Sequence, residues 1–103
     1  MTFDQYQTTA YSFALPKAKN ELYMFTNLAG EVGEACSIVA KAQRAGTTVD
    51  TRSLKKELGD ILWMVAGIAS LYGINLSDVA SSNISKLDSR KNRGVLLGNG
   101  DDR

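Results

Sequence analysis

The 103-residue chain contains no histidine, and this absence excludes many familiar kinds of hydrolytic site. A Ser-His-Asp triad, a Cys-His pair, a zinc site with imidazole ligands and a di-iron bundle with Glu-x-x-His all require it. The single cysteine, Cys36, also excludes an internal disulfide, and its apolar neighbours predict a small buried hydrophobe rather than a reactive thiol. Any chemistry must therefore use carboxylates, hydroxyls, amides and cations.

Excess charge and long apolar segments are absent as well. Lysine and arginine number 12 against 11 acidic residues, so a net charge of +1 predicts no nucleic-acid polymer as a partner. The longest apolar run, residues 61–74, is too short for a bilayer span and contains glycine and serine. The start, MTFDQYQ, lacks the layout of a secretory signal. We expect a cytoplasmic protein without a membrane partner.

Proline occurs once and strand patterns are nearly absent, which favours an all-α chain. Helices are predicted over residues 2–14, 20–45, 51–72 and 77–92. Pro16 interrupts the chain after the first helix, Gly46 and Gly73 are helix-ending residues, and Ser77 is a candidate N-cap. We predict a single domain over residues 1–103, a four-helix bundle-like subunit with antiparallel central helices.

Two stretches of the central helices repeat the pattern L-x-x-E-x-G-[E/D] at an offset of 26 residues: LAGEVGEACSIVA and LKKELGDILWMVA. At about 100° per residue, each stretch has an apolar stripe that we expect to face the core. The stripes are Leu28, Val32, Ala35, Cys36 and Val39 in the first, and Leu54, Leu58, Ile61, Leu62 and Val65 in the second. Antiparallel packing through these stripes would bring together the four acidic residues at their edges: Glu31, Glu34, Glu57 and Asp60.

Four carboxylates in one place repel one another unless a cation neutralises them. All-oxygen coordination suits hard divalent ions, Mg²⁺ foremost and Mn²⁺ next. Gly33 and Gly59 hold equivalent places away from the stripes, although a glycine inside a helix costs about 1 kcal/mol. Their placement suggests close approach by another molecule, such as a second subunit. The alternative is an ordinary solvated acidic face with no metal.

The doubled motif resembles a known family. LAGEVGEA followed by LKKELGDILWMVAGIA is similar to the E-x-x-E and E-x-x-D signature of the MazG-like, all-α nucleoside triphosphate pyrophosphohydrolases. The segment NISKLDSRKNRGVLLGNGDDR is similar to the basic helix and tail of small members, so the resemblance covers roughly residues 20–103. Many members have two consecutive glutamates where this chain has Gly30 and then Glu31.

The resemblance implies hydrolysis of a (deoxy)nucleoside triphosphate to the monophosphate and pyrophosphate, possibly as nucleotide-pool house-cleaning. It implies Mg²⁺ bound by Glu31, Glu34, Glu57 and Asp60, with Glu31 as the catalytic residue that activates the attacking water. Two alternatives stay open. One is a non-enzymatic helical module that binds nucleotides or a protein, and the other is a phosphoribosyl-ATP or dUTP pyrophosphohydrolase.

Phosphate groups also need cations and hydrogen-bond donors. Asn83, Lys86 and Arg90 recur along one face of the last helix, and Arg93 and Arg103 are looser candidates in the segment that follows. The core side of this helix is predicted to consist of Val79, Ala80, Ile84 and Leu87. A basic last turn also complements the helix dipole, which is the structural alternative.

Apolar residues on second helix faces indicate assembly, because a chain of this length buries a modest core. The residues in question are Met24, Trp63, Met64 and Leu71. Trp63 could stack on a nucleobase or fill an interface. We expect a homodimer or homotetramer, the states that the resemblance also implies.

Overall fold

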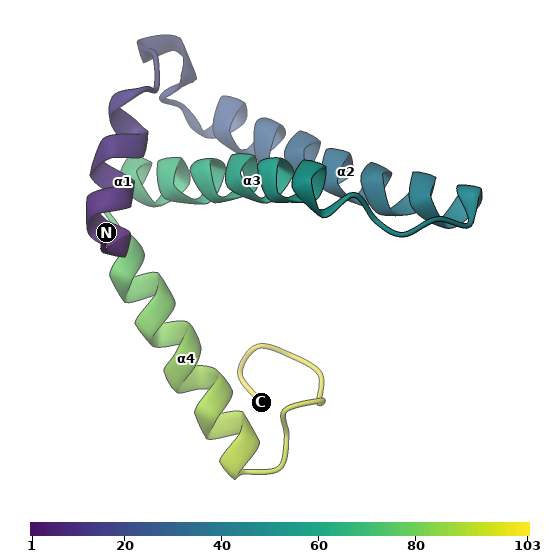
Figure 1. Ribbon diagram of the computed structural model, residues 1–103. Helices are drawn as coiled ribbons and strands as arrows, with labels where there is room; N and C mark the ends of the chain where they lie inside the picture. The colour runs from purple at the N-terminus through teal and green to yellow at the C-terminus, as the bar shows by residue number, and fades with distance from the viewer.

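A computed structural model describes all residues, 1–103, and contains four α-helices and no strand (Figure 1). The helices are α1 (Phe3–Ser12), α2 (Glu21–Ala45), α3 (Thr51–Leu71) and α4 (Leu76–Asn92), and a short 3-10 turn (Pro16–Ala18) joins α1 to α2. The all-α prediction is confirmed. The predicted helix ends differ from the observed ones by a residue or two at most positions.

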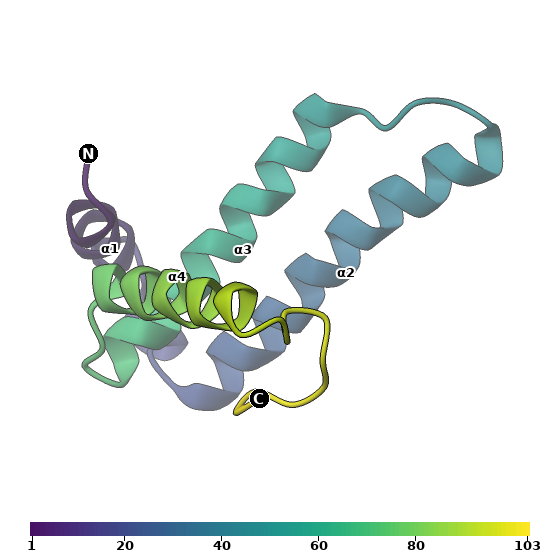
Figure 2. The ribbon, with the colours of Figure 1, turned by 90° about the horizontal axis from the view of Figure 1, so that it is seen from below.

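The central pair, α2 and α3, runs antiparallel as a long hairpin in both views (Figures 1 and 2). Local capping sets its ends. The Asn20 side chain accepts a hydrogen bond from the Tyr23 amide, and Gly46 ends α2 in the left-handed conformation with φ of 68°. Asp50 then accepts from the amides of Arg52 and Ser53 at the start of α3. These signals lie within a few residues of each helix end and were readable in the sequence.

The seam between α2 and α3 contains only part of the predicted stripes, since Leu28 and Ala35 on α2 and Leu54 and Ile61 on α3 are shielded. Several predicted core residues are exposed: Val32 (43%), Val39 (42%) and Leu58 (54%), and Cys36 is also exposed. The predicted stripes are therefore correct in part, and the prediction of a buried Cys36 is wrong. The shielded positions recur three or four residues apart, and on α2 they are Met24, Leu28, Glu31, Ala35, Ile38 and Ala42. Their partners on α3 include Leu54, Glu57, Ile61, Met64 and Ile68.

A small core lies at the end of the hairpin that meets α1. Met24 and Met64 form it with Ala14, so the expectation that these methionines await another subunit is wrong. Gly67 allows the close packing here, because a Cβ at this position would lie 2.8 Å from the Met24 sulfur. Trp63 packs against the same core and donates its indole N–H to the Ala10 carbonyl at 2.8 Å, which ties α3 to α1.

Long-range hydrogen bonds from α1 fix the start of α4. Gln7 is buried, donates to the Ile74 carbonyl at 2.8 Å and accepts from the Leu76 amide at 2.8 Å. Asp4 accepts from the amide and hydroxyl of Ser77. The N-cap residue by position is Asn75, which makes no capping bond, and not Ser77 as predicted. Side chains of α1 thus provide the cap that α4 lacks locally.

From this capped start α4 extends away from the α2–α3 hairpin (Figures 1 and 2). Its packing within the chain is chiefly against α1. Val79 (41%), Ile84 (66%) and Leu87 are exposed as a result, so the predicted core side of α4 has no core to face in this chain. No single helix is long and apolar enough to cross a membrane; α3 and α4 meet that length and composition only as a pair bent by 106°.

Candidate metal centre

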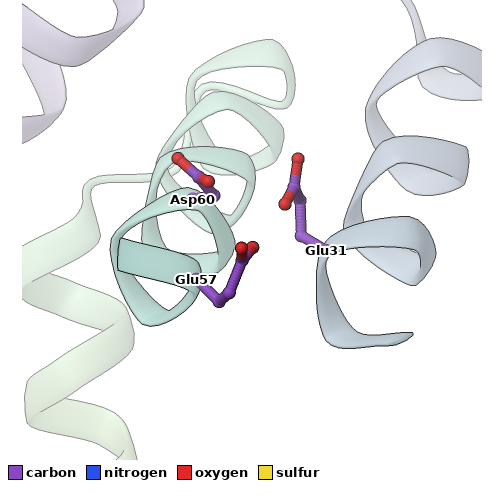
Figure 3. Close-up of side chains that lie close together, drawn as sticks. All are labelled: Glu31, Glu57 and Asp60. Carbon is purple, nitrogen blue, oxygen red and sulfur yellow. The ribbon is translucent and has the colours of Figure 1, made fainter. Parts of the chain in front are cut away.

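Three of the four predicted acidic residues meet between α2 and α3. Glu31 reaches across from α2 toward Glu57 and Asp60 on α3 (Figure 3), and one carboxylate oxygen from each residue lies within 4.8 Å of the others. We call these three residues the acidic cluster. The doubled motif explains the meeting, because Glu31 and Glu57 hold equivalent positions in the two repeats and both fall in the seam. Asp60 joins them from one turn further along α3.

No cationic side chain pairs with the acidic cluster. One oxygen of Glu57, Oε2, is buried and has no hydrogen-bond partner. Neither of the ion pairs in the chain involves the cluster, since both connect α4 to Asp101. A buried, unpartnered carboxylate oxygen costs free energy unless a proton or cation satisfies it. An all-oxygen donor set at this separation fits a hard divalent cation such as Mg²⁺ or Mn²⁺.

The raised pKa of Glu31 also indicates that the carboxylates of the cluster repel one another. Burial raises the pKa of Glu31, and the negative charges of Asp60, Glu34 and Glu57 raise it further. Burial and the charge of Asp60 also raise the pKa of the Tyr6 hydroxyl, which places this α1 side chain within electrostatic reach of the cluster. The local field is thus negative enough to oppose ionisation of nearby acids, as expected where carboxylates gather without a counter-ion.

Glu34, the fourth predicted ligand, is not part of the group of three. It is exposed and lines an open hollow of about 600 Å³ together with Glu57 and Lys41. Its charge still contributes to the raised pKa of Glu31. Gly33 lines the same hollow, and a Cβ at Gly33 or Gly59 would meet no atom of this chain within 4 Å. Packing within one chain therefore does not account for these two glycines.

The predicted phosphate-binding residues lie on and after α4, apart from the acidic cluster. Asn83 and Lys86 line an open depression of about 400 Å³ on α4. Arg90 is buried (5% exposed). Arg93 donates to the Ser89 hydroxyl at 3.0 Å and to the carbonyl of Arg103, whose own guanidinium contacts backbone carbonyls. The structure keeps these cations near one another but does not bring them to the carboxylates within one chain.

Sequence reasoning missed Asp101, which forms ion pairs with both Lys86 and Arg90. It lies in a glycine-rich segment without periodicity, so no pattern placed it near α4. The only signal was the glycines themselves: Gly94 and Gly100 have positive φ and allow the chain to turn back. Gln7 and Asp4 were missed for a similar reason, since their partners are more than 60 residues away.

Fold and site together define an all-α protein with a carboxylate-only site between two antiparallel helices. The sequence model of the MazG nucleotide pyrophosphohydrolase domain matches residues 19–95, and the chain belongs to this family. It is also similar to the Gene 37 protein of Mycobacterium phage L5, with 42% identity over 85 residues that span 79% of this chain and 75% of that protein. No solved structure matches the chain.

Proposed function

We propose that the chain hydrolyses (deoxy)nucleoside triphosphates to the monophosphate and pyrophosphate in a Mg²⁺-dependent reaction. The acidic cluster carries this proposal, because Glu31, Glu57 and Asp60 meet and leave a buried oxygen of Glu57 without a partner. Membership of the MazG family supports the reaction class. Removal of noncognate nucleotides from the pool is a role that such a reaction would suit.

In this reaction the oxygen of water attaches to the α-phosphorus, the bond from that phosphorus to the bridging oxygen breaks, and pyrophosphate leaves. Glu31, Glu57 and Asp60, with Glu34 from the adjoining hollow, would hold the cation. When bound, Mg²⁺ supplies positive charge that neutralises phosphate oxygens and favours in-line attack. Glu31 would accept a proton from the water, which is the role that the family resemblance implies for the first glutamate of the doubled motif.

Asn83, Lys86, Arg90 and Arg93 are the proposed phosphate-binding residues. Their cationic groups suit the charge of a triphosphate, and Asn83 and Lys86 border an open depression. Because α4 extends away from the hairpin, one chain alone does not bring this face to its own acidic cluster. A second copy could supply the missing half, which connects the phosphate site to assembly.

The proposed assembly is at least a homodimer, formed through the exposed face of α2 and α3. Leu22, Phe25, Val32 and Val39 are exposed on α2, and their spacings of three, seven and seven residues keep them on one side of the helix. Leu58 and Leu62 continue the apolar face on α3. Light scattering should give at least twice the 11.2 kDa chain mass, and a Leu58→Glu substitution should shift the mass toward that of one chain. A wild-type monomer at micromolar concentration would contradict this part of the proposal.

The proposed domain spans residues 1–103, more than the matched 19–95. Helix α1 lies outside the matched region, yet two of its residues connect it to the rest of the chain. Ala10 accepts a hydrogen bond from Trp63 on α3, and Gln7 bonds to α3 and to the start of α4. A chain lacking α1 would leave the amide of Leu76 without its partner. We therefore treat α1 as an integral part of the same domain.

A screen of nucleoside triphosphates, with dUTP and phosphoribosyl-ATP included, tests the function by pyrophosphate release with Mg²⁺, with Mn²⁺ and with chelator. Asp60→Asn and Glu34→Gln should each lower the rate by orders of magnitude, because each removes charge from the site. Asp88→Asn is the matched control, since Asp88 is an exposed α4 carboxylate outside both ion pairs. Full activity in both site variants would refute the acidic cluster as the site of the reaction. No pyrophosphate release from any triphosphate with either metal would favour a non-enzymatic binding module.

A further inference from the structure

A single carboxylate, that of Asp101, forms ion pairs with two cations of the proposed phosphate site, Lys86 and Arg90. Asp101 Oδ1 lies 2.9 Å from Lys86 Nζ and 3.0 Å from Arg90 Nη2. Arg90 Nη2 also donates to the backbone carbonyl of Asp101. Lys86 and Arg90 are one helical turn apart, so their side chains converge on the same point. An anionic oxygen held by two cations is the arrangement that a phosphate oxygen would adopt there.

The segment that carries Asp101, residues 94–103, is folded back beside the last turns of α4, and we call it the return loop (Figures 1 and 2). Gly94 and Gly100 have φ of 71° and 84°, a region that favours glycine. The Arg103 guanidinium donates to the carbonyls of Val95 and Leu96 at 2.8 and 2.7 Å and also to that of Gly100. A Cβ on Gly98 would lie 2.8 Å from Arg103 Cδ. The loop is therefore closed on itself in a defined shape.

The two sides of the contact differ greatly in burial. The Arg90 side chain is 6% exposed, whereas that of Asp101 is 80% exposed. Arg90 Nε is buried and has no hydrogen-bond partner, so the cationic side retains an unused donor. An exposed carboxylate loses little when it returns to water, but a buried guanidinium needs an anionic partner. The anion is thus the replaceable member of the pair.

We propose that the return loop is an internal competitor for the phosphate site, with Asp101 occupying the place that a substrate phosphate takes. This inference rests on the phosphate-binding role proposed above for Lys86 and Arg90. Substrate must displace the loop before it binds, so its apparent affinity is reduced by the fraction of molecules in which the loop is docked. Hydrogen bonds from Lys86 and then from Arg90 lower the pKa of Asp101, as expected for a carboxylate that two cations contact.

Titration with tripolyphosphate in the absence of divalent ions tests the competition directly. Asp101→Asn should bind tripolyphosphate about two- to fivefold more tightly than the wild type, the range expected for a largely exposed ion pair. Asp102→Asn, a change in the neighbouring exposed acid outside both ion pairs, should bind like the wild type. Combined with Lys86→Ala, the Asp101→Asn change should lose part of its effect, because one of the two cations that Asp101 contacts is gone.

A second variant guards against an effect of Asp101 on folding. Gly98→Val retains Asp101 but disturbs the loop closure, and it should also tighten binding; circular dichroism melts verify that each variant is folded. Unchanged or weaker tripolyphosphate binding in folded Asp101→Asn and Gly98→Val would overturn the proposal and leave Asp101 as a structural contact.

Turnover separates this inference from the proposed function. If the wild type hydrolyses a triphosphate, Asp101→Asn should lower KM by the same factor and leave kcat unchanged, and an unaltered KM would count against the loop. If no triphosphate is hydrolysed, the proposed function fails, while the tripolyphosphate titration still decides whether Asp101 competes for the cations.

Discussion

Glu57→Gln should stabilise the metal-free protein, although it alters a residue in the main helix seam. The oxygens of Glu57, Glu31 and Asp60 lie within 4.8 Å of one another. Two unit charges at that distance repel by about 0.9 kcal/mol in water and about 3.5 kcal/mol at an effective dielectric constant of 20. Because Asp60 is exposed and Glu31 partly so, we expect the lower end, a gain of about 1 to 2 kcal/mol.

Mg²⁺ should make the wild type more stable than Glu57→Gln, which reverses the order of stability expected without metal. A ligand that binds only the native state at one hundred times its dissociation constant stabilises it by about 2.7 kcal/mol. The wild type should therefore gain stability in millimolar Mg²⁺, and Glu57→Gln should gain much less because it lacks one of the charges that hold the cation. The assay is a set of thermal melts by circular dichroism, with Mg²⁺ and with chelator. A change of 1 kcal/mol should move Tm by roughly 4 to 8 °C in a domain of this size.

Asp88→Asn again serves as the control, and its melting temperature should equal that of the wild type both in chelator and in Mg²⁺. Two results would refute the reasoning about Glu57. A folded Glu57→Gln protein that is less stable than the wild type in chelator would show that the carboxylate stabilises the seam rather than straining it. Equal gains from Mg²⁺ in both proteins would show that the ion binds elsewhere.

Two further predictions concern the helix caps. Gln7→Ala should destabilise the fold by about 1 to 3 kcal/mol in denaturant titrations, because it leaves the buried Leu76 amide without an acceptor. The exposed Gln43→Ala should change the stability little. Hydrogen bonds from Ser53 lower the pKa of Asp50, so its stabilising effect is complete above the unfolded-state pKa and is lost as pH falls through the lower folded-state pKa. Wild-type melts should therefore lose more stability than Asp50→Ala melts between about pH 5 and pH 2.5, and parallel losses would contradict this assignment.

The helices could be predicted because their signals are local. Asn20, Gly46 and Asp50 each act on backbone groups within a few residues, so a reading of neighbours was sufficient. The pairing of α2 with α3 followed from the doubled motif in the same way. The meeting of Glu31, Glu57 and Asp60 required only that equivalent repeats lie opposite each other in an antiparallel pair.

Only part of the seam could be predicted, because apolar residues on α2 extend over two adjacent faces. Met24 and Leu28 lie on one face of α2, while Val32 and Val39 lie on the other, and both sets recur at helical spacing. Periodicity cannot decide which face packs within the chain. Which face packs depends on contacts between residues distant in sequence. One example is the Met24 side chain, which packs against Gly67 because that residue has no Cβ.

The direction of α4 and the position of Asp101 escaped prediction for a related reason. The cap of α4 comes from Asp4 and Gln7, which are separated from it by most of the chain. Asp101 reaches Lys86 only because several glycines and the Arg103 contacts close the return loop. Neither feature produces a periodic pattern, so only a three-dimensional structure connects these residues.

The doubled motif places charge where a helix hairpin would otherwise place apolar side chains. Glu31 and Glu57 occupy seam positions flanked by Leu28 and Ile61, so the middle of the hairpin gains repulsion instead of hydrophobic burial. The Met24–Met64 core at one end, together with apolar seam residues such as Ile38 and Leu54 toward the other, must therefore hold the two helices together while the carboxylates remain near each other. Separating the stabilising contacts from the charged ones allows the cluster to stay charged and unpartnered without unfolding the hairpin. A cation bound there would then join the helices at the one level where the protein's own side chains push them apart.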